Sequence, residues 1–284
     1  MKSRNVYIVG GARIPFMKSM TAYRDVSSEE LMTASLKSLV NRYNLEGKTV
    51  GDVALGAVMH SSANWNLSRE VVQSSGLHPN TPAYNVQRAC GTSLENTIQI
   101  AHKISSHQIE SGIAGGVDSN SDLPIMVSRT FARKLIALNS ARTLGEKVKI
   151  ILGIKPSDLK PVLPAVVEPR TGKSMGEHCE LMVKEWNISR QEQDELALTS
   201  HRNAAQAYKE GFYDDLVFPF QGNKTDGILR ADTTLEKLSK LKPVFDKYLQ
   251  TSILAVIFGS FTAFLMGMDF PFSTKRFSRL ASTD

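Results

Sequence analysis

The sequence predicts an α/β fold, in which a mostly parallel sheet with covering helices is followed by a mostly helical insertion. In the first 120 residues, short apolar runs alternate with helix-like segments, as in parallel βαβ units. From residue 122 to 247, prolines and charged stretches replace this alternation. The 284 residues are 42% hydrophobic and 22% charged, which suits a globular chain with a core.

Four strands are expected in the first part of the chain. Residues 6–9 form a short apolar run that stops at Gly10 and Gly11, so they are predicted to be a buried strand. Apolar runs predict three further strands, at 52–58, 83–86 and 109–117.

Helices are expected between these strands. Ser27 and Glu30 have the spacing of a capping box, and the helix that they begin is predicted to run to Tyr43. A second helix is predicted over 67–75, ending at Gly76. The third, over 93–106, is predicted from apolar residues that step by three or four. These residues are Leu94, Ile98, Ala101 and Ile104.

The insertion contains one clearly marked helix. Ser189 and Glu192 form a second capping box, and Gly211 marks the end of the helix. Loops on a rigid α/β scaffold often carry ligand sites. The predicted domain limits are 1–121 for the α/β core, 122–247 for the inserted loop domain and 248–284 for an apolar tail.

Charge and cysteine content argue against several classes of protein. The 34 Lys and Arg exceed the 28 Asp and Glu by a net charge of +6, but they form no continuous basic block, so no nucleic-acid partner is expected. Two cysteines cannot build a disulfide framework, and the apolar run near the start is too short for a signal peptide. A cytoplasmic location is therefore expected. The His and Cys residues lack zinc-ligand spacing, so no metal site is expected.

Cys90 is the main candidate for a catalytic group. It lies between the strand at 83–86 and the helix at 93–106, where the helix dipole and backbone N–H groups favour a nucleophilic thiolate. The alternative, a small buried structural residue, stays open. Cys179 is expected on a helix, with a structural role.

Eight segments then stand in a characteristic order over about residues 5–247. They are 12–16, 87–93, 115–119, 174–180, 188–194, 200–205, 230–236 and 241–246. Together they resemble the thiolases, acyl-CoA C-acyltransferases that form or cleave 3-ketoacyl-CoA. Asp118, Ser119 and the segment 123–125 resemble the trifunctional β-oxidation type most closely.

The resemblance implies a family fold of two similar βαβαβαββ halves, of which this chain would hold the N-terminal half with its loop domain. It implies that Cys90 accepts the acyl group as a thioester, and that Met175 and Arg230 contact coenzyme A. Coenzyme A would be a substrate, so no cofactor is expected. The implied function is acyl transfer in fatty-acid β-oxidation, with acyl-CoA and coenzyme A as ligands. A second copy of the chain or a β-oxidation subunit would be the macromolecular partner.

The sequence departs from the family after Lys247. The family's T-A-G-N-[SA] segment, its G-G-G-x-x-x-G-H-P histidine and its C-x-G-G-G cysteine do not occur. We therefore expect a missing C-terminal half and an activity that is reduced or lost. Residues 248–268 carry no charge. This pattern is expected from a shifted reading frame or, alternatively, from a membrane segment over 251–268.

Two alternatives to an active thiolase stay open. The chain could be a non-catalytic thiolase remnant that only contacts other subunits. It could also be another condensing enzyme, such as a ketoacyl synthase, although the segments between Met175 and Arg230 favour a thiolase.

Overall fold

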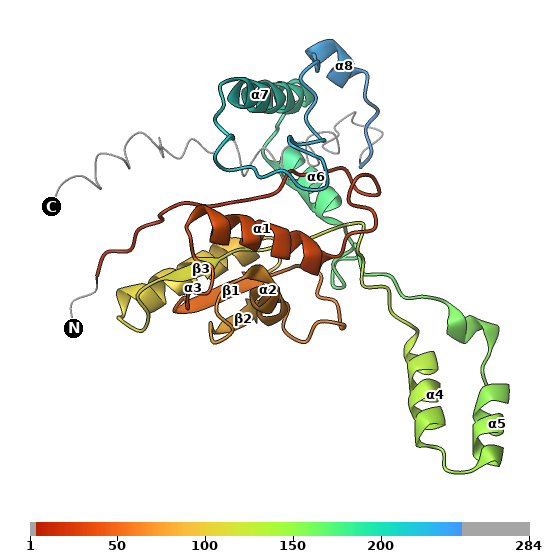
Figure 1. The fold of residues 1–284 in the computed structure, drawn as a ribbon. Helices are drawn as coiled ribbons and strands as arrows, with labels where there is room; N and C mark the ends of the chain where they lie inside the picture. Colours follow the sequence, from red (N-terminus) through yellow and green to blue (C-terminus); the bar gives the residue numbers. More distant parts are fainter. Residues whose placement is uncertain (1–3, 246–284) are drawn as a thin grey trace. The chain divides into compact units, whose positions relative to one another are not determined.

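The computed structural model describes residues 4–245, which form two compact units (Figure 1). The first unit comprises residues 4–165 together with Val217–Lys224, and the second comprises Val166–Leu216 together with residues 225–245. The tail expected over 248–284 lies outside the described residues. The domain limits expected at 121 and 247 stay predictions.

A three-stranded parallel sheet organises the first unit. Its central strand, β1 (Asp52–Gly56), pairs with β2 (Ala83–Val86) on one side and with β3 (Gly112–Ala114) on the other. Every residue of β1 is buried, as expected for a central parallel strand that is covered on both faces. The α/β prediction with a parallel sheet is therefore confirmed for this unit.

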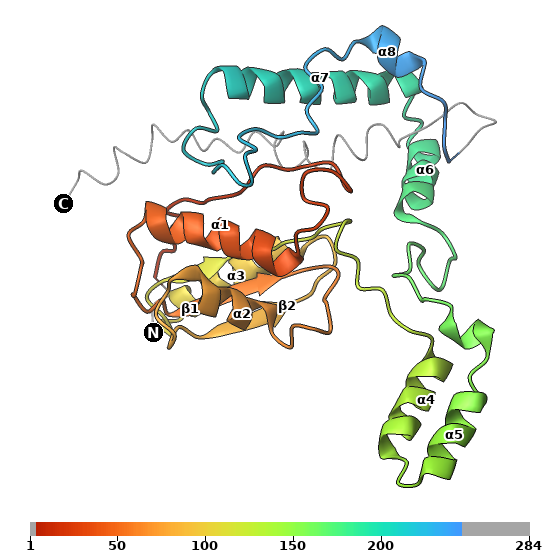
Figure 2. The same ribbon diagram turned by 45° about the vertical axis from the view of Figure 1, so that its right-hand side comes forward.

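Helices cover both faces of this sheet (Figure 2). Helices α1 (Ser28–Arg42) and α2 (Leu67–Ser75) pack with Val53 and Leu55 of β1 in one apolar core. Side chains alternate between the faces of a strand, and α3 (Thr92–Ser105) packs on the opposite face. The capping box at Ser27 and the left-handed Gly76 that ends α2 are both confirmed.

The apolar stripe that predicts α3 is not the face that this helix buries. Leu94 is 66% exposed and Ile98 is 40% exposed, whereas Thr92, Asn96 and Ile100 are the buried residues. Glycines on the sheet explain the difference, because they let the helix come close. A Cβ added at Gly112 would lie 2.7 Å from Cγ2 of Ile100.

The strand predicted over residues 6–9 is wrong. Tyr7, Ile8 and Val9 are 70%, 61% and 80% exposed, and the segment forms no ladder with the described strands. It is held from its two ends instead. Arg4 donates from Nε to the carbonyl of Ile104 (2.7 Å), and Arg42 donates to the carbonyl of Gly11 (2.9 Å). An apolar run becomes a strand only where a neighbouring strand satisfies its backbone groups.

Helices α4 (Arg129–Ser140) and α5 (Leu144–Leu152) form a hairpin, followed by a short 3₁₀ helix, η1 (Pro156–Leu159). No residue of α4 or α5 is buried. The hairpin is therefore held by contacts between its own elements rather than by a core.

The second unit contains α6 (Met175–Glu185), α7 (Arg190–Lys209) and α8 (Leu235–Ser239) around a small apolar core. The capping box of Ser189 and Glu192 begins α7, and Gly211 follows its end in a left-handed conformation, as expected. Among residues 4–245, no helix has the length and apolarity to cross a bilayer. In the same range, no three His, Cys, Asp or Glu side chains gather as metal ligands.

Candidate active site

The loop between β2 and α3 presents Cys90 to solvent. Ala89, which precedes it, has a left-handed backbone with φ of 43°. The hydroxyl of Thr92 holds this turn, because it accepts from the N–H of Arg88 (2.8 Å) and donates to the carbonyl of Ala89 (2.7 Å). Cys90 is thus an exposed side chain on a tight, hydrogen-bonded turn.

The position of Cys90 suits a nucleophile. It lies two residues before the first residue of α3, where backbone N–H groups of a helix have no carbonyl in a preceding turn. The guanidinium of Arg88 forms an ion pair with Glu95 of the same helix. The thiol is therefore exposed to solvent just before the N-terminal, positive end of α3.

Asp118 ties together the loops around Cys90. Its carboxylate accepts hydrogen bonds from the N–H of Val58 (3.0 Å) and of Met59 (3.1 Å), which follow β1. The carbonyl of Val58 in turn accepts from the side-chain amide of Gln87 (3.0 Å), in the loop that carries Cys90. The carboxyl ends of the three parallel strands are thus joined at one edge of the sheet.

The glycines before Asp118 are required for close packing. A Cβ added at Gly116 would lie 2.4 Å from the hydroxyl of Ser93, and the carbonyl of Gly115 accepts from the side-chain amide of Asn96 (2.7 Å). The sequence interpretation assigned no role to Asp118 beyond its motif. An acidic residue directly after a strand-end glycine pair, at the same sheet edge as Cys90, is the signal that could have indicated it.

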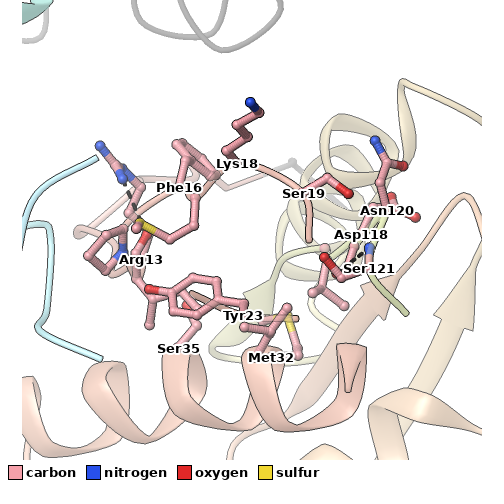
Figure 3. Close-up of a pocket in the computed structure, with 17 residues that line it drawn as sticks. Arg13, Phe16, Lys18, Ser19, Tyr23, Met32, Ser35, Asp118, Asn120 and Ser121 are labelled. Atoms are coloured by element: carbon pink, nitrogen blue, oxygen red, sulfur yellow. Dashed lines mark hydrogen bonds between the residues drawn. The ribbon is translucent and has the colours of Figure 1, made fainter. Parts of the chain in front are cut away.

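A pocket of about 320 Å³ brings two of the sequence motifs together (Figure 3). Its walls are residues 13–19 on one side and 116–121 on the other. Met32 and Ser35 of α1 lie beneath these walls, and the ring of Tyr23 lies between them. Cys90 is not among the lining residues. The segments 12–16 and 115–119 are therefore neighbours in space, although about 100 residues separate them in the sequence.

Met175 and Arg230 belong to the second unit, whereas Cys90 belongs to the first. Met175 begins α6 and is 61% exposed. Arg230 is exposed, and its backbone N–H donates to Nδ1 of His201 (3.4 Å). Burial, and then the charge of Arg230, lower the pKa of His201. His201 is therefore neutral near pH 7 and can accept this hydrogen bond.

Cys179 differs from Cys90 in its surroundings. It lies on α6, is half-buried and packs beside the small core of the second unit. Burial, and to a lesser extent the charge of Glu180, raise the pKa of the Cys179 thiol. A raised pKa keeps it in the less nucleophilic thiol form at neutral pH, which agrees with the structural role expected for it.

Known proteins resemble both the sequence and the fold. The 3-ketoacyl-CoA thiolase of Pectobacterium carotovorum subsp. carotovorum (strain PC1) is 41% identical over 248 residues, which cover 85% of this chain and 57% of that protein. The protein of the same name from Shewanella baltica (strain OS155) is 41% identical over 254 residues, with coverage of 87% and 58%. The crystal structure of the Bacillus anthracis acetyl-CoA acetyltransferase superposes with a TM-score of 0.72 at 26% identity, over 88% of this chain and 61% of that one.

The chain thus spans somewhat more than half the length of the curated relatives that it matches. Residues 6–253 also match the family description "Thiolase, N-terminal domain". This match covers most of the chain and includes the Cys90 loop, the glycine pair before Asp118 and the helices that carry Met175 and His201. The chain therefore belongs to the thiolase family.

Proposed function

We propose that this chain carries the acyl-accepting part of a thiolase-type acyl-CoA C-acyltransferase, with Cys90 as the nucleophile. The observation that carries the proposal is the exposed thiol of Cys90 on a tight turn at the start of α3. The names of the relatives, 3-ketoacyl-CoA thiolase and acetyl-CoA acetyltransferase, support the same chemistry.

In the proposed step, the thiolate of Cys90 attacks the carbonyl carbon of an acyl-CoA. The bond between this carbon and the coenzyme A sulfur breaks, and coenzyme A leaves as a thiolate that takes up the proton lost by Cys90. The acyl group is then held as a new thioester, which remains activated for transfer. Backbone N–H groups at the start of α3 favour the negative charge that develops on sulfur and oxygen.

The second unit supplies the proposed coenzyme A contacts. Met175 offers an exposed apolar side chain, and the guanidinium of Arg230 suits a bidentate contact with a phosphate group. His201 holds the backbone of Arg230, so it acts as a positioning residue. Coenzyme A is a substrate in this proposal, and no cofactor takes part.

The proposed setting is fatty-acid β-oxidation in the cytoplasm, with a second copy of the chain or a β-oxidation subunit as partner. The relatives' names support the substrate class, and two cysteines without a disulfide support a reducing compartment. The family match favours a thiolase over a ketoacyl synthase.

The 284 residues contain neither the G-H-P histidine nor the C-x-G-G-G cysteine. General acid–base groups of this kind each contribute about 10²- to 10⁴-fold to a rate. We therefore propose that this chain by itself accepts an acyl group on Cys90 but turns over slowly or not at all.

Release of coenzyme A tests the proposal. The purified chain is incubated with acetyl-CoA, and free coenzyme A is measured by chromatography. We expect about one equivalent per chain, lost in Cys90→Ser and kept in the matched control Cys179→Ser. Release that persists in Cys90→Ser would contradict the assignment of Cys90 as the nucleophile. No release from the parent chain or from Cys179→Ser would favour the non-catalytic remnant.

A further inference from the structure

Cys90 lies inside two consecutive tight turns. The carbonyl of Arg88 accepts from the N–H of Gly91 (3.0 Å), and the carbonyl of Ala89 accepts from the N–H of Thr92 (3.2 Å). Cys90 is a central residue of both turns, so a change in the conformation of either turn moves its thiol. The backbone of residues 88–92, the Cys90 turns, therefore sets the position of the thiol.

The backbone is strained directly before Cys90. Ala89 has a φ of 43°, in the left-handed region that is unfavourable for a residue with a Cβ. Such a conformation persists only where the surrounding structure enforces it. Ala89 is exposed, so the packing of its own side chain does not supply this restraint. The restraint comes from hydrogen bonds to the backbone of the Cys90 turns.

Thr92 supplies two of these hydrogen bonds from a buried position. It is 5% exposed, and its hydroxyl accepts from the N–H of Arg88 (2.8 Å) and donates to the carbonyl of Ala89 (2.7 Å). Its methyl group lies at the end of β1, where a Cβ added at Gly56 would come within 2.5 Å of Cγ2. One side chain thus connects a fully buried strand to the Cys90 turns.

We infer that Thr92 is a positioning residue for acyl transfer, because its hydroxyl holds the strained Cys90 turns in the geometry that the thiol needs. The inference rests on the proposed function, in which the sulfur of Cys90 attacks an acyl carbonyl carbon. Thr92 acts through the backbone and takes no part in the bonds that form and break. Attack requires aligned atoms, and a displacement of about 1 Å can lower a rate about 100-fold.

Two substitutions separate the hydroxyl of Thr92 from its methyl group. Thr92→Val keeps the shape of the side chain and the methyl contact with Gly56, but it removes both hydrogen bonds. Thr92→Ser keeps the hydroxyl and removes the methyl group. The matched control is Thr97→Val in the same helix, since the hydroxyl of Thr97 donates to the carbonyl of Ser93 (2.9 Å) and not to the Cys90 turns.

The kinetic experiment follows acetylation of Cys90 in the full 284-residue chain by peptide mass spectrometry, at several concentrations of acetyl-CoA. Thr92→Val should lower the maximal rate by about 30-fold. The half-saturating concentration should not change, because the proposed coenzyme A contacts lie in the second unit. Thr92→Ser and Thr97→Val should both keep the maximal rate within about threefold of the parent chain.

Alkylation by iodoacetamide distinguishes the position of the thiol from its general reactivity. This small reagent attacks an exposed thiol without being held in one orientation, so Cys90 should be alkylated equally fast in the parent chain and in Thr92→Val. An equal loss of acetylation and alkylation would overturn the inference, since Thr92 would then control the exposure or ionisation of the thiol. Acetylation as fast in Thr92→Val as in the parent would also overturn it. Acetylation as slow in Thr92→Ser as in Thr92→Val would assign the effect to the methyl contact instead.

A spectroscopic readout tests the role of the hydroxyl without acyl-CoA. The ¹³Cα and ¹³Cβ chemical shifts of Ala89 report its left-handed backbone, and they should change in Thr92→Val but not in Thr92→Ser. Unchanged shifts in Thr92→Val would overturn the inference. If the parent chain is not acetylated at all, the proposed function fails, and these shifts alone decide whether Thr92 holds the Cys90 turns. If Thr92→Val does not fold, hydrogen exchange of the Arg88 amide in the parent chain decides: we expect protection, and rapid exchange would contradict the bond to Thr92.

Discussion

Strand β1 and the hairpin of α4, α5 and η1 are stabilised in opposite ways. All residues of β1 are buried between two neighbouring strands and helices on both faces, whereas α4 and α5 bury no residue. The candidate active site stands at the end of β1, where loops meet through close backbone contacts. In the hairpin, Lys134 of α4 donates to the carbonyl of Gly153 at the end of α5 and forms an ion pair with Asp158 of η1. The same substitution should therefore have different consequences in the two regions.

The largest effect is expected from Gly56→Ala. A Cβ at this position would lie 2.0 Å from the carbonyl oxygen of Val86 and 2.5 Å from Cγ2 of Thr92. The nearer atom belongs to the backbone of β2 and cannot rotate away, so we expect a loss of more than about 4 kcal/mol in the free energy of unfolding of the first unit. Hydrogen exchange of the β1 amides measures this loss.

The matched substitution in the hairpin is Gly145→Ala. No atom lies within 4 Å of the added Cβ, and alanine favours a helix over glycine, so α5 should gain about 0.5 kcal/mol. Exchange protection of the α5 amides measures this gain. A destabilised α5, or a first unit that tolerates Gly56→Ala, would break the comparison.

Replacing one leucine in each region by alanine tests the same comparison between β1 and the hairpin. Leu55 of β1 is fully buried, while Leu152 of α5 is 80% exposed. Leu55→Ala should cost about 3 kcal/mol because it leaves a cavity, and Leu152→Ala should change stability by less than about 0.5 kcal/mol. Urea unfolding with unchanged m-values is the measurement. Similar costs at the two positions would mean that Leu152 is covered in solution.

The stability of the hairpin of α4, α5 and η1 should depend on pH through Asp158. The ammonium of Lys134, and then the N–H of Lys155, hold the pKa of Asp158 below its usual value. A depressed pKa gives stability that is present above the pKa of the unfolded chain and is lost as the pH falls through the lower folded pKa. In the parent chain, the helicity of α4 should decrease as the pH is lowered from about 5 to about 2. The ¹³C chemical shifts of α4 measure this decrease.

The control for this response is Asp158→Asn, which carries no titrating group at this position and should show no such step. A step of the same size in Asp158→Asn would assign the pH response to another carboxylate.

A small gain in stability is expected from a substitution at the turn before the nucleophile. Ala89 has a φ of 43°, a conformation that costs a residue with a Cβ about 1 kcal/mol. Ala89→Gly should therefore stabilise the first unit by up to about 1 kcal/mol, as measured by thermal unfolding. Destabilisation would indicate that the methyl group of Ala89 makes a contact that outweighs the strain.

Local signals in the sequence predict much of the fold. The capping box at Ser27, the left-handed Gly76 and the strand at 83–86 appear where the pattern places them. The strand expected over 52–58 ends at Gly56, and the N–H groups of Val58 and Met59 donate to Asp118 instead of to a neighbouring strand. The exposed Cys90 also lies between a strand and a helix, as predicted.

Features that depend on distant neighbours could not be predicted in this way. Residues 6–9 have the composition of a strand but lack a partner among the described residues. The burial of Asn96 rather than Leu94 in α3 depends on glycines in the strands against which α3 packs. The pocket between residues 13–19 and 116–121 appears only when the chain folds.

Peptide mass spectrometry after incubation with acetyl-CoA tests the central claim, that Cys90 is the acyl acceptor, most directly. We expect an acetyl group on the peptide that contains Cys90, no acetyl group on that peptide in Cys90→Ser, and an unmodified Cys179 in both proteins. Exposure at the start of α3 favours Cys90, while burial disfavours Cys179. An acetyl group on Cys179 with Cys90 unmodified would contradict the assignment.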